Sequence, residues 1–166
     1  MAEYEKEKKR AGMIVSSSRP LYENDADLVS ESLTLDLIEK KWRCEGVKLP
    51  IKHQLDYLLQ RRNRGVAWVE IKVRKNPAAQ YPTYMISLTK IMAARSLSEA
   101  SRLPSFLVVQ WSDSVAYIRM DSLLDFEISI GGRRDRNDDQ DIEPVVLIPV
   151  RNFTNLGDKG QNGQFS

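Results

Sequence analysis

The chain has 166 residues, with 25 Lys or Arg against 23 Asp or Glu, and a formal net charge of +2 at pH 7. This length is typical of one domain with a substantial core, and no apolar run is long enough for a membrane helix. We expect a cytoplasmic protein without a membrane partner, since the N-terminus also lacks the apolar core of a signal peptide. The single cysteine and single histidine exclude an intramolecular disulfide framework and a Cys/His zinc site.

The N-terminal segment, residues 1–24, is expected to be a flexible arm, because it carries mixed charges without an apolar stripe and contains a Ser-Ser-Ser-Arg-Pro linker. The first helix is predicted at 27–42, where apolar residues recur every three or four positions. Glu31 interrupts this otherwise apolar face. The apolar positions of the face are Leu28, Leu35, Ile38 and Trp42.

Three strands are predicted after this helix, at 47–50, 53–59 and 66–74, with a turn at 61–65 before the third. Residues of the third strand alternate in character, and successive side chains of a strand point to opposite faces. One face of that strand is therefore apolar, and the other is polar. The polar face holds Trp68, Glu70, Lys72 and Arg74.

The next elements along the chain are a helix and two paired strands. The helix is predicted at 87–100, with Ser87 as its N-cap. The two strands are predicted at 106–111 and 115–120, and a short polar turn joins them into a hairpin.

The C-terminal part predicts strands at 123–130 and 145–150, separated by a polar loop at 131–143. Prolines at both ends of the second of these strands favour an edge position for it. Residues 155–166 are expected to form a disordered tail. The whole order predicts an α/β fold with a central mixed sheet flanked by helices, as one domain from 25 to 154 with a strand extension from about residue 121.

Basic residues are concentrated around the third strand. Between residues 60 and 75 there are six basic side chains and one acidic side chain, a local charge of +5. We interpret this segment as a DNA-binding patch that faces phosphate groups, although a solvated basic hairpin would have the same pattern. The basic residues are Arg61, Arg62, Arg64, Lys72, Arg74 and Lys75.

A carboxylate and an ammonium on the same strand face, Glu70 and Lys72, begin a candidate catalytic site. Charges beside a core are costly unless they have a partner or a function. Asp56 on the preceding strand is expected opposite or diagonal to Glu70, and Glu31 is expected to aim at the same region. Converging carboxylates repel one another unless a cation lies between them, and oxygen ligands suit Mg²⁺ or Mn²⁺. The pattern predicts metal-dependent phosphodiester cleavage, in which Lys72 orients the attacking water or stabilises the transition-state charge.

The order of these residues resembles the signature of the PD-(D/E)XK nuclease superfamily, which has a restriction-endonuclease-like fold. Its pattern is Glu on the first helix, Asp on a hairpin strand, and Glu/Asp-x-Lys on the next strand. Residues from about 27 to 120 follow the family's order of elements, and the chain is most similar to small phage-type and Holliday-junction-resolvase-like members. One departure is Leu55, where the family often has proline. The matching positions are Glu31, Asp56, Glu70 and Lys72.

The resemblance implies a Mg²⁺- or Mn²⁺-dependent deoxyribonuclease of DNA repair, recombination or phage DNA processing, in the host cytoplasm if the chain is phage-encoded. It implies that Asp56 and Glu70 bind the metal, with the Ile71 carbonyl as a third ligand. Glu31 would be a second-site or water-mediated ligand, and Lys72 would be the catalytic lysine.

Several alternatives stay open from the sequence. Lys90, at the start of the second helix, either faces a phosphate or is an ordinary solvated lysine. The loop 81–84 (Tyr-Pro-Thr-Tyr) either contacts substrate or packs within the protein. The alternative function is a catalytically inactive nucleic-acid-binding or assembly module on the same fold. A homodimer is a further expectation, because symmetric cleavage of two strands needs two copies.

Overall fold

The computed structural model describes residues 25–132, 142–160 and 163–166. The expected arm at 1–24 and most of the loop at 131–143 lie outside the described residues. No helix in the described ranges is both long and apolar enough to cross a membrane. The elements in chain order are α2 (Asp25–Trp42), β1 (Glu45–Lys48), β2 (Tyr57–Arg61), β3 (Arg64–Val73), β4 (Thr83–Ser87), α3 (Leu88–Ser101), β5 (Ser105–Gln110), β6 (Ser114–Arg119), β7 (Glu127–Gly132), β8 (Ile142–Pro149) and β9 (Thr154–Asp158).

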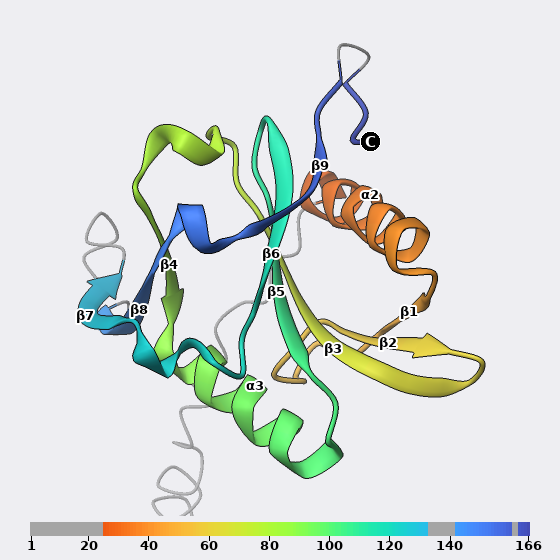
Figure 1. The fold of residues 1–166 in the computed structure, drawn as a ribbon, viewed down its shortest axis with the longest axis horizontal. Coiled ribbons are helices and arrows are strands. Elements are labelled where there is room, and N and C mark those ends of the chain that lie inside the picture. Colours follow the sequence, from red (N-terminus) through yellow and green to blue (C-terminus); the bar gives the residue numbers. More distant parts are fainter. Residues whose placement is uncertain (1–24, 133–141, 161–162) are drawn as a thin grey trace, which may run out of the picture.

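The larger of two sheets has six strands in the order β1-β2-β3-β5-β6-β9 (Figure 1). Strands β3 and β5 are parallel, and the other neighbours are antiparallel. Helix α3 lies in the crossover between β3 and β5, as parallel neighbours require a long connection. The predicted mixed sheet flanked by helices is confirmed.

Helix α2 covers one face of this sheet. Its residues Leu37 and Ile38 are buried in one cluster with Val69, Ile71 and Val108 of the central strands. The apolar face predicted for β3 is thus the face beneath α2. Burial of side chains of this size contributes about 1.5–3 kcal/mol each, so this packing holds α2 to the sheet more than helix propensity does.

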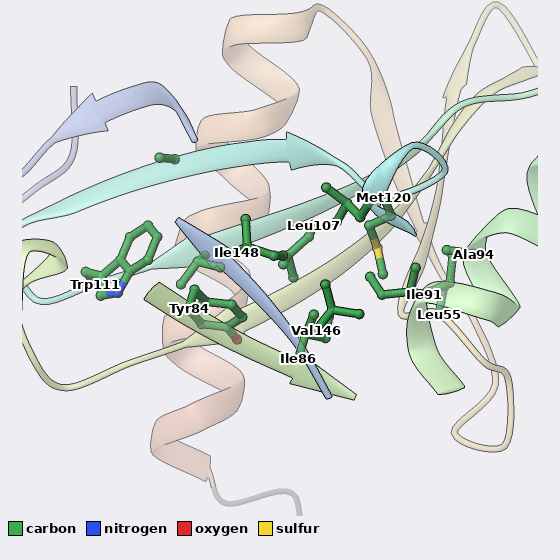
Figure 2. Close-up of a cluster of buried hydrophobic side chains, with 13 residues drawn as sticks. Leu55, Tyr84, Ile86, Ile91, Ala94, Leu107, Trp111, Met120, Val146 and Ile148 are labelled. Atoms are coloured by element: carbon green, nitrogen blue, oxygen red, sulfur yellow. The ribbon is translucent and has the colours of Figure 1, made fainter. Parts of the chain in front are cut away.

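The opposite face of the sheet packs against α3 and a smaller sheet in the order β4-β8-β7. In Figure 2, Ile86 of β4, Val146 of β8, Leu107 of β5 and Ile91 of α3 gather in this second core. The polar positions of β3 point toward this side because side chains alternate along a strand. The second core therefore supports the surroundings of Glu70.

The hairpin between β2 and β3 differs in extent from its predicted form. Strand β2 begins at Tyr57, and residues 53–56 are bends instead of part of the predicted strand 53–59. Arg62 and Asn63 have φ angles of 51° and 60°, the left-handed pair that makes a two-residue turn compatible with strand twist. The turn is therefore tight, and β3 starts at Arg64, two residues earlier than predicted.

Two predictions for the C-terminal part are wrong. Strand β8 lies between β4 and β7, not at an edge, because Pro144 and Pro149 are near its ends and leave 145–148 free for pairing on both sides. Residues 154–158 form β9, which pairs with β6 and inserts Leu156 into the α2-side core, so the tail expected at 155–166 is partly a strand. Phe165 also pairs back onto Lys159.

Candidate active site

Asp56 and Glu70 lie side by side across the β2–β3 hairpin. Tyr57 is paired with Val69, and the preceding Asp56 N–H donates to the Val69 carbonyl at 3.1 Å. The Asp56 Oδ2 atom accepts a hydrogen bond of 2.9 Å from the Ile71 N–H. The predicted neighbourhood of the two carboxylates is confirmed, although Asp56 precedes the strand instead of belonging to it.

The Glu70 carboxylate is fully buried, with 0% of the residue exposed. Its Oε1 atom lies 2.6 Å from Lys72 Nζ and 3.0 Å from Lys90 Nζ, so two ammonium groups share one carboxylate oxygen. Lys90 also donates a hydrogen bond of 3.2 Å to the other oxygen, Oε2. Among the described residues, however, none makes a well-aligned hydrogen bond to Oε1.

The charges of this cluster shift the pKa values of its members. Burial and then the nearby Glu70 raise the pKa of the Asp56 carboxyl, while Lys72 and Lys90 oppose the shift. Burial lowers the pKa of the Lys72 ammonium, but the charges of Glu70 and Asp56 outweigh burial and the net shift is upward. The charges around Lys72 therefore favour its protonated, hydrogen-bond-donating form.

The donor atoms of this cluster fit a small divalent cation. The buried Glu70 Oε1 atom has two ammonium groups as its nearest partners, and their positive charge balances the carboxylate as a cation would. Glu70 and Asp56 supply oxygen donors, and the Ile71 carbonyl faces the same side as the Ile71 N–H that binds Asp56. No group of three or more Asp, Glu, His or Cys that could hold a metal occurs in the described part of the chain. Two carboxylates are nevertheless what Mg²⁺ typically uses, with water and substrate phosphate as further ligands.

Glu31 does not join this cluster, which corrects the expectation that it aims at the same region. Its Oε1 atom accepts a hydrogen bond of 2.7 Å from the Tyr57 hydroxyl and also pairs with Lys48. Tyr57 belongs to the core beneath α2, on the face of the sheet opposite to the polar face of β3. Glu31 points from α2 toward the sheet, as predicted. It meets the face that α2 covers, whereas Glu70 lies on the opposite face.

Lys90 is a site residue whose partner the sequence did not reveal. It lies in the first turn of α3, and besides Glu70 it binds the Gln54 carbonyl at 2.6 Å. It is neither a free phosphate contact nor a purely solvated lysine in this structure. The only sequence signal was its place near a helix N-terminus, and that position does not identify a carboxylate on another element as its partner.

The basic residues expected to form one patch are divided between the two ends of β3. Arg61 donates hydrogen bonds to the carbonyls of Arg43 and Trp42 at the end of α2, so it caps the C-terminus of that helix. Arg62 and Arg64 are exposed at the turn, about 20 Å from Glu70 at the usual rise per strand residue. At the opposite end, Lys75 is exposed just beyond the last residue of β3. These basic residues therefore do not form one continuous surface, and their contact with DNA stays a prediction.

Arg74 continues the polar face of β3 beyond Lys72. Its Nη2 atom donates to the Tyr84 hydroxyl at 2.8 Å, and its guanidinium lies 5.2 Å from the centroid of the Tyr84 ring. Burial raises the pKa of the Tyr84 hydroxyl, against the opposing charges of Arg74 and Lys72. The Tyr84 phenol is thus a neutral group that borders the charged cluster.

Comparison with known proteins gives one family and several similar folds. The sequence profile of the family described as "Phage putative PDDEXK endonuclease" matches residues 17–156. No curated protein sequence matches the chain. A Holliday junction resolvase from Archaeoglobus fulgidus is 9% identical, with a TM-score of 0.45 over 72% of this chain and 82% of its own. A nuclease from a fusselovirus is 16% identical, with a TM-score of 0.46 over 78% of this chain and 81% of its own.

The family profile spans most of the chain and includes every residue of the Asp56, Glu70 and Lys72 cluster. The resemblance to PD-(D/E)XK nucleases is therefore confirmed at the level of the family. This chain belongs to the phage PD-(D/E)XK endonuclease family and is a nuclease, a hydrolase of phosphodiester bonds.

Proposed function

We propose that this nuclease is a Mg²⁺-dependent DNA endonuclease whose reaction centre consists of Asp56, Glu70 and Lys72. The observation that carries the proposal is the buried Glu70 carboxylate. Its Oε1 atom touches two ammonium groups yet has no aligned hydrogen bond among the described residues. A carboxylate in this state, beside a second carboxylate, is suited to holding a divalent cation, with Mn²⁺ as an alternative to Mg²⁺.

Hydrolysis joins a water oxygen to phosphorus and breaks the bond between phosphorus and one ester oxygen, which leaves as an alcohol after taking up a proton. When bound, Mg²⁺ supplies Lewis-acid charge that stabilises the phosphoryl transition state. Asp56 and Glu70 hold that ion, and the Ile71 N–H fixes the orientation of Asp56. Lys72 keeps its proton and donates hydrogen bonds to the attacking water or to a phosphoryl oxygen, where negative charge develops.

The direct test is cleavage of supercoiled plasmid DNA with Mg²⁺, with Mn²⁺ and with EDTA. We expect cleavage with either metal and none with EDTA. Lys72→Ala should lower the rate by about 10²–10³-fold, the usual loss on removing one preorganised transition-state donor. Lys41→Ala, at an exposed position on α2, is the matched control and should cleave like wild type.

The same assay separates the alternative function. Wild-type protein that binds DNA with metal present but cleaves no substrate would favour an inactive binding or assembly module. Equal rates for wild type and Lys72→Ala would remove Lys72 from the proposed chemistry. The place of the reaction in repair, recombination or phage DNA processing belongs to this proposal, as do the cytoplasmic location and a homodimer.

A further inference from the structure

A hollow of about 460 Å³ lies immediately beyond the charged cluster, at the end of β3. One wall is the loop that follows β3, and the other is formed by β4 and the end of β8. We propose that this pocket receives an unpaired nucleobase of the DNA substrate, one or two nucleotides from the phosphate that is cleaved. This inference rests on the proposed nuclease function and names a substrate class for it. The residues used in the argument are Arg74, Asn76, Tyr81, Tyr84 and Trp111.

The pocket lies near the proposed reaction centre. Arg74 lines it and is the first residue after β3, two residues beyond Lys72, so its backbone is about 13 Å from that of Glu70. Tyr84, which also lines the pocket, interacts electrostatically with Lys72 and Glu70. This separation is short enough for a DNA strand with one phosphate at Glu70 to place a nearby nucleotide at the pocket.

The lining chemistry suits a flat heterocycle more than a phosphate or an aliphatic group. The Tyr81 side chain is a large aromatic group that is 57% exposed at the pocket. The Arg74 guanidinium is a second planar surface, and flat cations and aromatic rings are the groups on which bases stack. The side-chain NH₂ group of Asn76 donates to the Pro77 carbonyl. The side-chain oxygen Oδ1 of Asn76 is left to accept a hydrogen bond from the edge of a base.

The loop that carries these groups is fixed before any substrate binds. Asp113, in the β5–β6 turn, accepts from the Ala78 N–H at 3.0 Å, and the Ser112 N–H donates to the Asn76 carbonyl at 3.0 Å. At the other end, the Pro82 carbonyl accepts from the Val150 N–H at 2.9 Å. A preformed pocket spares the ordering cost of binding and so favours a specific occupant.

The floor of the pocket is part of the second core. Trp111 lies 6.0 Å from Tyr84 between ring centroids, in an edge-to-face arrangement, and Figure 2 shows the two residues in the same cluster. Trp111 is 3% exposed and cannot move aside without opening that core. Bases inside a paired duplex are stacked on their neighbours, so only an unpaired or flipped base can enter.

The test uses the full chain and 2-aminopurine, a fluorescent base, placed at the unpaired nucleotide beside the cleaved bond of a flapped or gapped DNA. Binding in EDTA, where cleavage is excluded, should quench its fluorescence because the base stacks on Tyr81 and Arg74. Tyr81→Ala should weaken this binding about 10-fold, whereas Tyr81→Phe, which keeps the ring, should restore it. Met92→Ala, an exposed residue of α3 outside the pocket, is the matched control.

Cleavage of paired and unpaired substrates gives the second readout. We expect the ratio of kcat/KM for flapped over fully paired DNA to fall about 10-fold in Tyr81→Ala, with Tyr81→Phe close to wild type. Equal ratios in all three proteins, together with no quenching, would overturn the inference and leave the nuclease function intact. If wild type cleaves no DNA, the proposed function fails, and the quenching series still decides whether the pocket takes a base.

Discussion

Lys90 of α3 and Glu70 of β3 form an ion pair across the crossover between two parallel strands. The Lys90 Nζ atom lies 3.0 Å from Glu70 Oε1, the same oxygen that Lys72 contacts from the neighbouring position on β3. Lys90 therefore balances the charge of a buried carboxylate. A divalent cation at Glu70 would do the same, so the lysine and the metal act on the same group.

Replacing Lys90 with Ala is expected to destabilise the metal-free protein by about 1–2 kcal/mol, because Glu70 loses one of its two partners. The same change should increase the thermal stabilisation by Mg²⁺ or Mn²⁺, since less positive charge opposes the ion. Melting curves at several metal concentrations measure both effects, with Met92→Ala on the same helix as the control. A melting temperature that responds to metal as in wild type would show that Lys90 does not compete with the ion.

Replacing Glu31 with Ala is expected to leave DNA cleavage within about 3-fold of wild type, since Glu31 binds Tyr57 and Lys48 and not the acidic pair. Stability should fall by about 1.5–3 kcal/mol, the usual net value of a hydrogen bond to a charged group. Urea unfolding and plasmid cleavage check the two parts. A fall in cleavage of 100-fold or more with normal folding would return Glu31 to the reaction centre.

Replacing Asp56 with Asn is expected to abolish metal-dependent cleavage while keeping the fold. The amide oxygen can still accept from the Ile71 N–H, but the charge that holds a cation is lost. Metal binding measured by calorimetry should weaken at least 10-fold. Unchanged metal affinity in a folded Asp56→Asn protein would place the cation elsewhere.

The Cys44 thiol is expected to react slowly in the native state. Burial, and then the Glu39 charge, raise the pKa of this thiol above its ordinary value, while Arg61 opposes the shift. Because the native pKa is higher than the unfolded pKa, the neutral thiol favours folding at pH values below about 8.5, and this contribution is lost as the pH rises through the native pKa. Stability should therefore decline on the alkaline side.

The measurement for Cys44 is the rate of reaction with a disulfide reagent between pH 7 and pH 10. The native midpoint should lie above that of the urea-unfolded chain, which is the internal control. A native midpoint equal to or below the unfolded one would contradict the assignment of Cys44 as a buried, neutral thiol.

The pattern of the chain determined the features that depend on short sequence distances. Side chains on a strand repeat every two residues, so Glu70 and Lys72 had to share a face and Val69 and Ile71 had to share the other. A hairpin then brought Asp56 beside Glu70, and a register shift at Leu59 and Gln60 was needed for this, because the tight turn alone would pair Leu59 with Val66 instead of Ala67. The family signature rests on these local relationships, and it was predictable for that reason.

Contacts between elements that are distant in the chain were decided by the tertiary structure. Whether Glu31 met Glu70 or Tyr57 depended on which face of the sheet α2 covers, and a helix stripe does not specify this. The partner of Lys90 depended on how α3 crosses the sheet. The addition of β9 to the larger sheet depended on its pairing with the free edge of β6, which no local sequence pattern reveals. Periodicity orients a side chain relative to its own element, and only the packing of elements against one another determines what that side chain meets.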